Sequence, residues 1–119
     1  MKLFDSELKI MDALWREGNL SASQLVKCME NEIGWNKNTT YTVIKKCVEK
    51  GAIRREDPNY VCIALIGKEE VQKEETDELI NKLFEGSADL FFTRFLKSKK
   101  LSKKEIEQLK NTVEELKGW

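Results

Sequence analysis

Histidine is missing from this 119-residue chain, proline occurs once, and the three cysteines are widely spaced at Cys28, Cys47 and Cys62. Without histidine, the commonest metal ligand and the commonest general base are excluded. An odd set of distant cysteines, each within an apolar pattern, predicts buried free thiols and neither a disulfide framework nor a metal centre. A glycine-rich phosphate loop is also missing. We therefore expect no enzyme, no cofactor and no metal.

Long apolar runs are absent as well, and this bears on where the protein resides. The N-terminal sequence Met-Lys-Leu-Phe-Asp-Ser-Glu lacks the apolar stretch of a signal peptide. No run approaches the length that crosses a bilayer. With 40% hydrophobic and 35% charged residues, the composition is typical of one folded domain, or one domain with an appendage. We expect a cytoplasmic protein.

The net charge is zero, with 21 basic and 21 acidic residues, but the charges are segregated. Between residues 34 and 55, six basic residues stand against the single acid Glu49. Between residues 67 and 85, seven acidic residues outnumber three lysines. Contact with nucleic-acid phosphates requires a local basic surface, so the first of these stretches is the candidate interface.

The basic stretch contains an amphipathic helix pattern over residues 36–50. Its apolar side repeats at helical spacing and consists of Thr40, Val43, Ile44, Cys47 and Val48. The opposite side carries hydroxyl, amide and ammonium groups, from Asn38, Thr39, Tyr41, Thr42, Lys45 and Lys46. Hydroxyls and amides can reach base edges, ammonium groups can reach phosphates, and an amphipathic helix fits a major groove. The pattern therefore predicts a recognition helix.

Two other helix patterns precede this one. The first follows Asp5 or Ser6 as N-cap and stops at Gly18, where glycine can adopt the left-handed conformation. The second begins at Ser21, because Ser-Ala-Ser-Gln is a capping box. We expect it to bury Ala22, Leu25, Val26, Met29 and Ile33. Three helices joined by short turns, with a basic third helix, are typical of a helix-turn-helix bundle.

The period of the apolar pattern then changes from helical to alternating. Residues 52–56 and 60–64 flank Asp57-Pro58-Asn59, which is a turn sequence. This pattern predicts a β-hairpin, which forms the wing of a winged helix. A two-stranded hairpin is marginal alone, so we expect it to pack on the helices. Its Arg54 and Arg55 would then contact phosphates beside the groove.

Beyond Gly67 the pattern returns to helices, over residues 68–85, from Ser87, and from a capping box at Ser102. Their apolar positions include Leu79, Leu83, Phe84, Phe91, Phe92, Phe95, Leu96, Ile106, Leu109 and Val113. About fifty residues are too few to bury these stripes in a core of their own, so we expect a second copy to complete it. The predicted fold class is mostly α with a small β-hairpin wing. It comprises a winged helix-turn-helix DNA-binding domain at 1–66 and a helical dimerisation region at 67–119.

Several short sequences match those of a known regulator family in order and spacing. They are Glu7 to Met11 with Leu14-Trp15, Trp35 with Thr39 to Ile44, Lys50 to Ile53, Gly86-Ser87, Phe95-Leu96, and Leu101-Ser102 with Ile106 and Leu109. Over nearly its whole length the chain resembles the penicillinase-repressor family of winged-helix regulators. The resemblance implies a homodimer that represses transcription from a palindromic operator, of resistance or cell-envelope stress genes. The positions it matches to the DNA-reading helix are Asn38, Thr39, Tyr41, Thr42 and Lys46, while Lys45, Arg54 and Arg55 are assigned to phosphates.

Two departures from the family pattern concern how repression is relieved. Members that a sensor protease inactivates are cut at an Asn-Phe bond, and the aligned bond here is Arg94-Phe95. A sensor protease remains a candidate partner, but we do not expect cleavage of the usual type. The copper-responsive branch carries Cys-x-Cys pairs near the C-terminus, whereas no cysteine follows Cys62 here. We therefore expect no metal switch of that kind.

Two alternatives stay open at the level of sequence. A run with six positive charges and no acid consists of Arg94, Lys97, Lys99, Lys100, Lys103 and Lys104. Such a run is usually a solvated face, and a second DNA contact is the alternative. The rival to a repressor is a winged helix that has lost DNA binding and serves as a protein-interaction module. Its third helix would be neutral or acidic, whereas this one is basic.

Overall fold

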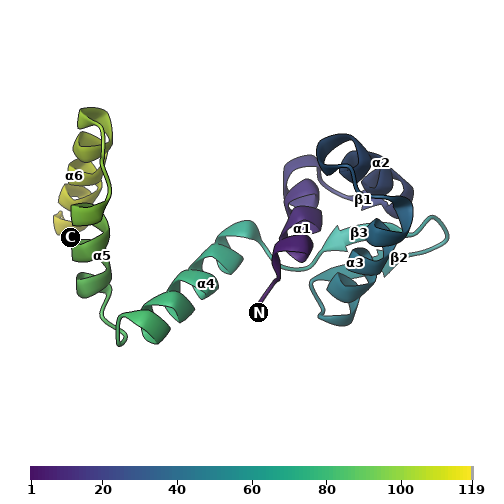
Figure 1. The fold of residues 1–119 in the computed structure, drawn as a ribbon, viewed down its shortest axis with the longest axis horizontal. Coiled ribbons are helices and arrows are strands. Elements are labelled where there is room, and N and C mark those ends of the chain that lie inside the picture. Colours follow the sequence, from purple (N-terminus) through teal and green to yellow (C-terminus); the bar gives the residue numbers. More distant parts are fainter. Residues whose placement is uncertain (119) are drawn as a thin grey trace. The chain divides into compact units, whose positions relative to one another are not determined.

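A computed structural model describes residues 1–118, which form two compact units that divide after Thr76. The first unit contains α1 (Asp5–Glu17), β1 (Leu20–Ser21), α2 (Ala22–Ile33), α3 (Lys37–Glu49), β2 (Ile53–Glu56), β3 (Val61–Ala64) and the start of α4 (Lys68–Leu83) (Figure 1). The predicted helix-turn-helix followed by a hairpin is confirmed. The fold class, mostly α with a small β-hairpin wing, is confirmed as well.

The strands of the first unit form one antiparallel sheet in the order β1-β3-β2. Ile53 pairs with Ala64 and Arg55 with Cys62 across the hairpin, and Leu20 pairs with Cys62 on the other side of β3. The sequence pattern predicted only the two strands of the hairpin. It missed β1, because a two-residue strand is too short to show an alternating pattern. This extra strand ties the wing to the start of α2.

The core of the first unit lies between its helices and the sheet. Fully buried side chains come from each of α1, α2, α3, β2 and β3, and include Ile10, Met11, Leu25, Met29, Ile44, Cys47, Ile53 and Cys62. Val71 of α4 joins this core, so the beginning of α4 belongs to the first unit. The first unit therefore has a core of its own. Each fully buried aliphatic side chain in it stabilises the fold by roughly 1.5–3 kcal/mol.

Three local predictions for the first unit were wrong. The N-cap of α1 is Phe4 and not Asp5 or Ser6, because the Glu7 carboxylate accepts the Phe4 N–H at 2.7 Å. Two residues of the stripe predicted for α2 are not buried: Val26 is half-buried, and Ile33 is 39% exposed because it is the last residue of the helix. Cys28 is only half-buried, although all three cysteines are free thiols as expected.

The second unit holds the end of α4, α5 (Ala88–Ser98) and α6 (Lys103–Lys117). Both predicted helix starts are confirmed, since the Ser87 hydroxyl accepts the Leu90 N–H, and Ser102 and Glu105 form a capping box. Among residues 77–118, Ile80 is the only buried side chain. This unit therefore has helices but almost no core. Within the described residues, no helix is long and apolar enough to cross a membrane.

Candidate nucleic-acid interface

The third helix has one buried and one exposed side, as its sequence pattern predicted. The Asn36 side chain caps it by accepting the Thr39 N–H at 2.8 Å. Thr40, which stands on the buried side, donates its hydroxyl to the Asn36 carbonyl at 3.2 Å and so hides its polar group. The other buried residues of α3 are Val43, Ile44 and Cys47. Because these side chains fix the rotation of α3, its opposite side must face solvent.

The exposed side of α3 presents most of the residues predicted to contact DNA. The exposed ones are Asn38, Thr39, Thr42, Lys45 and Lys46. The side chains of Lys45 and Lys46 make no hydrogen bond or ion pair with another described residue, so their ammonium groups are available to an external anion. Tyr41 differs from this group, because it is half-buried and its ring packs edge-on against Tyr60 at 5.9 Å between centroids.

The wing carries its two arginines exposed, but each has an acidic neighbour. Arg54 pairs with Glu56 at 3.0 Å, and Arg55 donates its Nε–H to Asp57 at 2.9 Å. Glu56 and Asp57 lie just beyond the basic stretch at residues 34–55, so the net charge of that stretch does not include them. The wing is therefore less basic than α3. When Arg54 or Arg55 binds a phosphate, its ion pair with the neighbouring carboxylate must break or be shared with the phosphate.

Lys50 is part of the basic stretch in the sequence but faces the interior of the first unit. Its Nζ donates to Glu7 Oε1 at 2.6 Å and to the Lys2 carbonyl at 3.0 Å, and lies 4.3 Å from the centroid of the Phe4 ring. Glu7 is 1% exposed. Burial would raise the pKa of Glu7, but the hydrogen bonds from Lys50 and from the Phe4 N–H outweigh it and hold that pKa below its usual value. Lys50 thus joins α3 to α1.

Cys47 and Cys62 lie in the core of the first unit and not on this surface. Burial raises the pKa of the Cys47 thiol to about 12 and that of the Cys62 thiol to about 11. Thiols of this kind stay protonated and are poor nucleophiles. Within residues 1–118, no cluster of cysteine, aspartate and glutamate side chains has the arrangement of a metal site.

Tyr60 stands beside the predicted DNA contacts, although no sequence pattern indicated a role for it. The Arg55 guanidinium lies over its ring, with Cζ 3.7 Å from the centroid. The register of the hairpin could have shown this proximity. Arg55 is opposite Cys62, so Tyr60 occupies a diagonal position that a long side chain can reach.

The residues predicted for dimerisation lie in the second unit and remain largely exposed. Described residues of α5 and α6 include no buried side chain. Phe91 is half-buried and contacts the rings of Phe84, Phe92 and Phe95 at 5.1 to 5.9 Å between centroids. The remaining apolar positions, each at least 41% exposed, are Leu79, Leu83, Leu96, Ile106, Leu109 and Val113.

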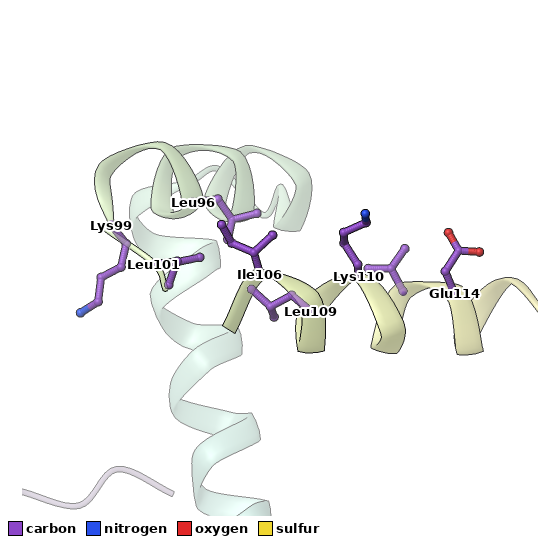
Figure 2. A pocket seen from close by; sticks show the side chains of 8 residues that line it. Leu96, Lys99, Leu101, Ile106, Leu109, Lys110 and Glu114 are labelled. Carbon is purple, nitrogen blue, oxygen red and sulfur yellow. The ribbon is translucent and has the colours of Figure 1, made fainter. Parts of the chain in front are cut away.

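An apolar groove of about 450 Å³ runs between α5 and α6. Figure 2 shows Leu96, Leu101, Ile106 and Leu109 gathered along it, while the Lys99 side chain extends away from them. Such exposed apolar surface is unusual for a helix pair that lacks a partner.

Comparison with known proteins gives one family over most of the chain. The model of the family described as penicillinase repressor matches residues 3–115. A penicillinase repressor of Bacillus licheniformis is 23% identical over 119 residues, covering 98% of this chain and 93% of that protein. The methicillin resistance regulatory protein MecI of Staphylococcus aureus (strain N315) is 24% identical over 114 residues, covering 94% and 93% respectively. These relatives are named as regulators, in agreement with a chain that is not an enzyme.

Proposed function

The chain belongs to the penicillinase repressor family of transcriptional repressors, and from this premise we propose that it acts as a homodimer on a palindromic operator. Two copies of α3 would enter successive major grooves, about one or two helical turns apart, with the wings on the flanking backbone. The relatives are named for penicillinase and for methicillin resistance. We therefore propose genes of antibiotic resistance or cell-envelope stress as its targets, and the cytoplasm as its place of action.

The observation that carries this proposal is the exposed side of α3. Thr39 and Thr42 are exposed there, as are Lys45 and Lys46, whose ammonium groups have no ion pair within residues 1–118. Hydroxyls and amides are suited to base edges, and lysines to phosphates. We assign base contacts to Asn38, Thr39, Tyr41 and Thr42, and phosphate contacts to Lys45, Lys46, Arg54 and Arg55.

The dimer is proposed from the missing core of the second unit. The apolar residues of α6 repeat at intervals of three and four, at Ile106, Leu109, Val113 and Leu116. This is the spacing of a helix that packs along a seam against another helix. All four are exposed within one chain, and a second copy would cover the same patch on both partners. We propose residues 1–66 as the DNA-binding domain and 67–119 as the dimerisation region.

A protein-interaction module without DNA binding is the rival function. Such a module would need a third helix whose exposed side suits a protein surface, with few charges or with acidic ones. The exposed side of α3 instead carries Lys37, Lys45 and Lys46 against the single acid Glu49. This balance favours a polyanionic partner.

A gel-shift series on a palindromic promoter fragment tests the proposal. We expect affinity to fall steeply from low to moderate salt, because each lysine or arginine that meets a phosphate releases counterions. Lys46→Ala should weaken binding to all sequences and make the salt slope shallower by about one. Thr42→Val keeps the size of the side chain and should change the preference at one base position only. Affinity that does not change with salt would reject the proposal.

A further inference from the structure

Tyr60, the last residue of the turn between β2 and β3, has an unusual backbone conformation. Its φ is +49°, in the left-handed region, where a bulky aromatic residue is strained. Such a conformation persists only where the surroundings hold it. Here the Tyr60 carbonyl accepts the N–H of Ala22 at 2.9 Å, and so satisfies a donor in the first turn of α2. The backbone of Tyr60 is therefore held by α2.

The Tyr60 ring contacts both parts of the candidate interface. The Arg55 guanidinium of β2 lies 3.7 Å from its centroid. The Tyr41 ring of α3 also meets it, edge-on, at an interplanar angle of 69°. These three side chains line one hollow of the surface together with Lys45, Val48 and Glu49. A single side chain thus connects the wing to the exposed side of α3.

Arg54 and Arg55 are neighbours on β2 but are held differently. The pair of Arg54 with Glu56 is exposed, and exposed ion pairs of this kind hold a side chain only weakly. Arg55 has a comparable pair with Asp57 and, in addition, the stack on Tyr60. Fixing a long arginine side chain costs rotamer entropy. Because Arg55 has a second contact that Arg54 lacks, less of this entropy remains to be lost when a ligand binds.

The hydrogen bond to Asp57 uses only Nε of the Arg55 guanidinium. The terminal N–H groups lie in the same plane and can donate in pairs to a phosphate. We propose that Tyr60 is a positioning residue, whose ring holds Arg55 in the orientation that contacts a DNA phosphate and couples that contact to α3 through Tyr41. This inference rests on the proposed function, because it assigns a role within the DNA interface.

The test uses the full chain and two substitutions of Tyr60. Tyr60→Asn removes the ring, and asparagine tolerates the left-handed backbone, so the turn is kept. Tyr60→Phe keeps the ring. We expect Tyr60→Asn to weaken operator binding on the order of fivefold and to make the salt slope shallower by about one, as Arg55→Ala does. Tyr60→Phe keeps the stacked ring and removes only the hydroxyl, which also interacts with the Arg55 guanidinium, so its affinity and salt slope should stay closer to those of the parent than to those of Tyr60→Asn.

A double-mutant cycle separates positioning of Arg55 from a general effect on the fold. Tyr60→Asn should cause a much smaller loss of affinity when Arg55 is already replaced by alanine, because the ring then has no guanidinium to hold and only its packing on Tyr41 is lost. Arg54→Ala is the matched control. The loss of binding free energy from Arg54→Ala and the loss from Tyr60→Asn should add in the double variant, since Arg54 does not touch the Tyr60 ring.

Three outcomes would overturn the inference. The first is an equal loss from Tyr60→Asn with and without Arg55, and the second is a loss from Tyr60→Phe as large as that from Tyr60→Asn. The third is an unchanged affinity and salt slope in Arg55→Ala while Lys46→Ala still weakens binding, which would leave the proposed function intact. By contrast, a parent protein that binds no palindromic DNA would reject the proposed function itself.

Discussion

The two units of this chain have the same local helix signals, but only the first of them buries a core. Each has amphipathic helices, and each starts a helix with a capping box, at Ser21 in the first unit and at Ser102 in the second. In the first unit the apolar faces meet and bury a core, whereas among residues 77–118 only Ile80 is buried. Local sequence thus determines where helices form. Whether a unit is stable without a partner depends on whether its apolar helix faces pack against one another within one chain.

The largest effect should come from a charge placed in the uncovered groove of the second unit. Leu109→Glu would bury a carboxylate in the proposed dimer interface, which costs several kcal/mol unless the dimer separates. We expect sedimentation to show a single chain. Operator affinity should fall roughly 100-fold, because the two DNA-binding domains are no longer linked and cannot bind as one unit.

A matched substitution on the same helix controls for added charge. Asn111 is exposed and does not line the groove, so Asn111→Glu should leave both the dimer and operator binding intact. If Leu109→Glu still sedimented as a dimer with the affinity of the parent, the groove would not be the interface.

The next effect concerns the first unit, which should be sensitive to the loss of a buried charge pair. Glu7→Gln weakens the bond to Lys50 and puts an amide NH2 in place of Oε2, an atom that has no hydrogen-bond partner among the described residues. We expect the free energy of unfolding to fall by about 2–3 kcal/mol. Urea unfolding of the full chain measures this, with the exposed Glu49→Gln as control. Equal stability of the two variants would contradict a structural role for the pair.

The same pair predicts how stability depends on pH. The pKa of Glu7 is lower in the folded chain than its ordinary value of 4.5. Its contribution is therefore present above pH 4.5 and is lost as the pH falls through the folded value. Between about pH 5 and pH 3, the parent should lose more stability than Glu7→Gln does. Parallel curves of unfolding free energy against pH would show that Glu7 keeps its ordinary pKa.

The smallest effect should come from removing the serine of each capping box, one in each unit. Ser21→Ala and Ser102→Ala remove the same cap hydrogen bond, each worth about 1 kcal/mol. In the first unit the loss should lower the unfolding free energy equally at all protein concentrations. In the second unit it should weaken the dimer, so its effect should grow as the protein is diluted. Urea unfolding at several protein concentrations checks this. The same dependence on protein concentration in both variants would show that the stability of the second unit does not depend on a dimer.

Much of this architecture could be predicted from sequence, because its signals are local. The cap at Asn36, the capping boxes and the apolar stripe of α3 each involve residues within four positions of one another. Contacts between distant residues were missed. Lys50 was counted as part of the basic surface, although it lies against Glu7, 43 residues away. The ring of Tyr60 was overlooked because its neighbours Tyr41 and Arg55 come from different elements.

We propose that the second unit is half of a core that another copy of the chain completes. Sedimentation equilibrium of the intact protein at micromolar concentration gives the number of chains in solution. We expect twice the 13.9 kDa mass of one chain, and two chains on each palindromic duplex. A mass of one chain, with α5 and α6 fully helical in that state, would contradict it.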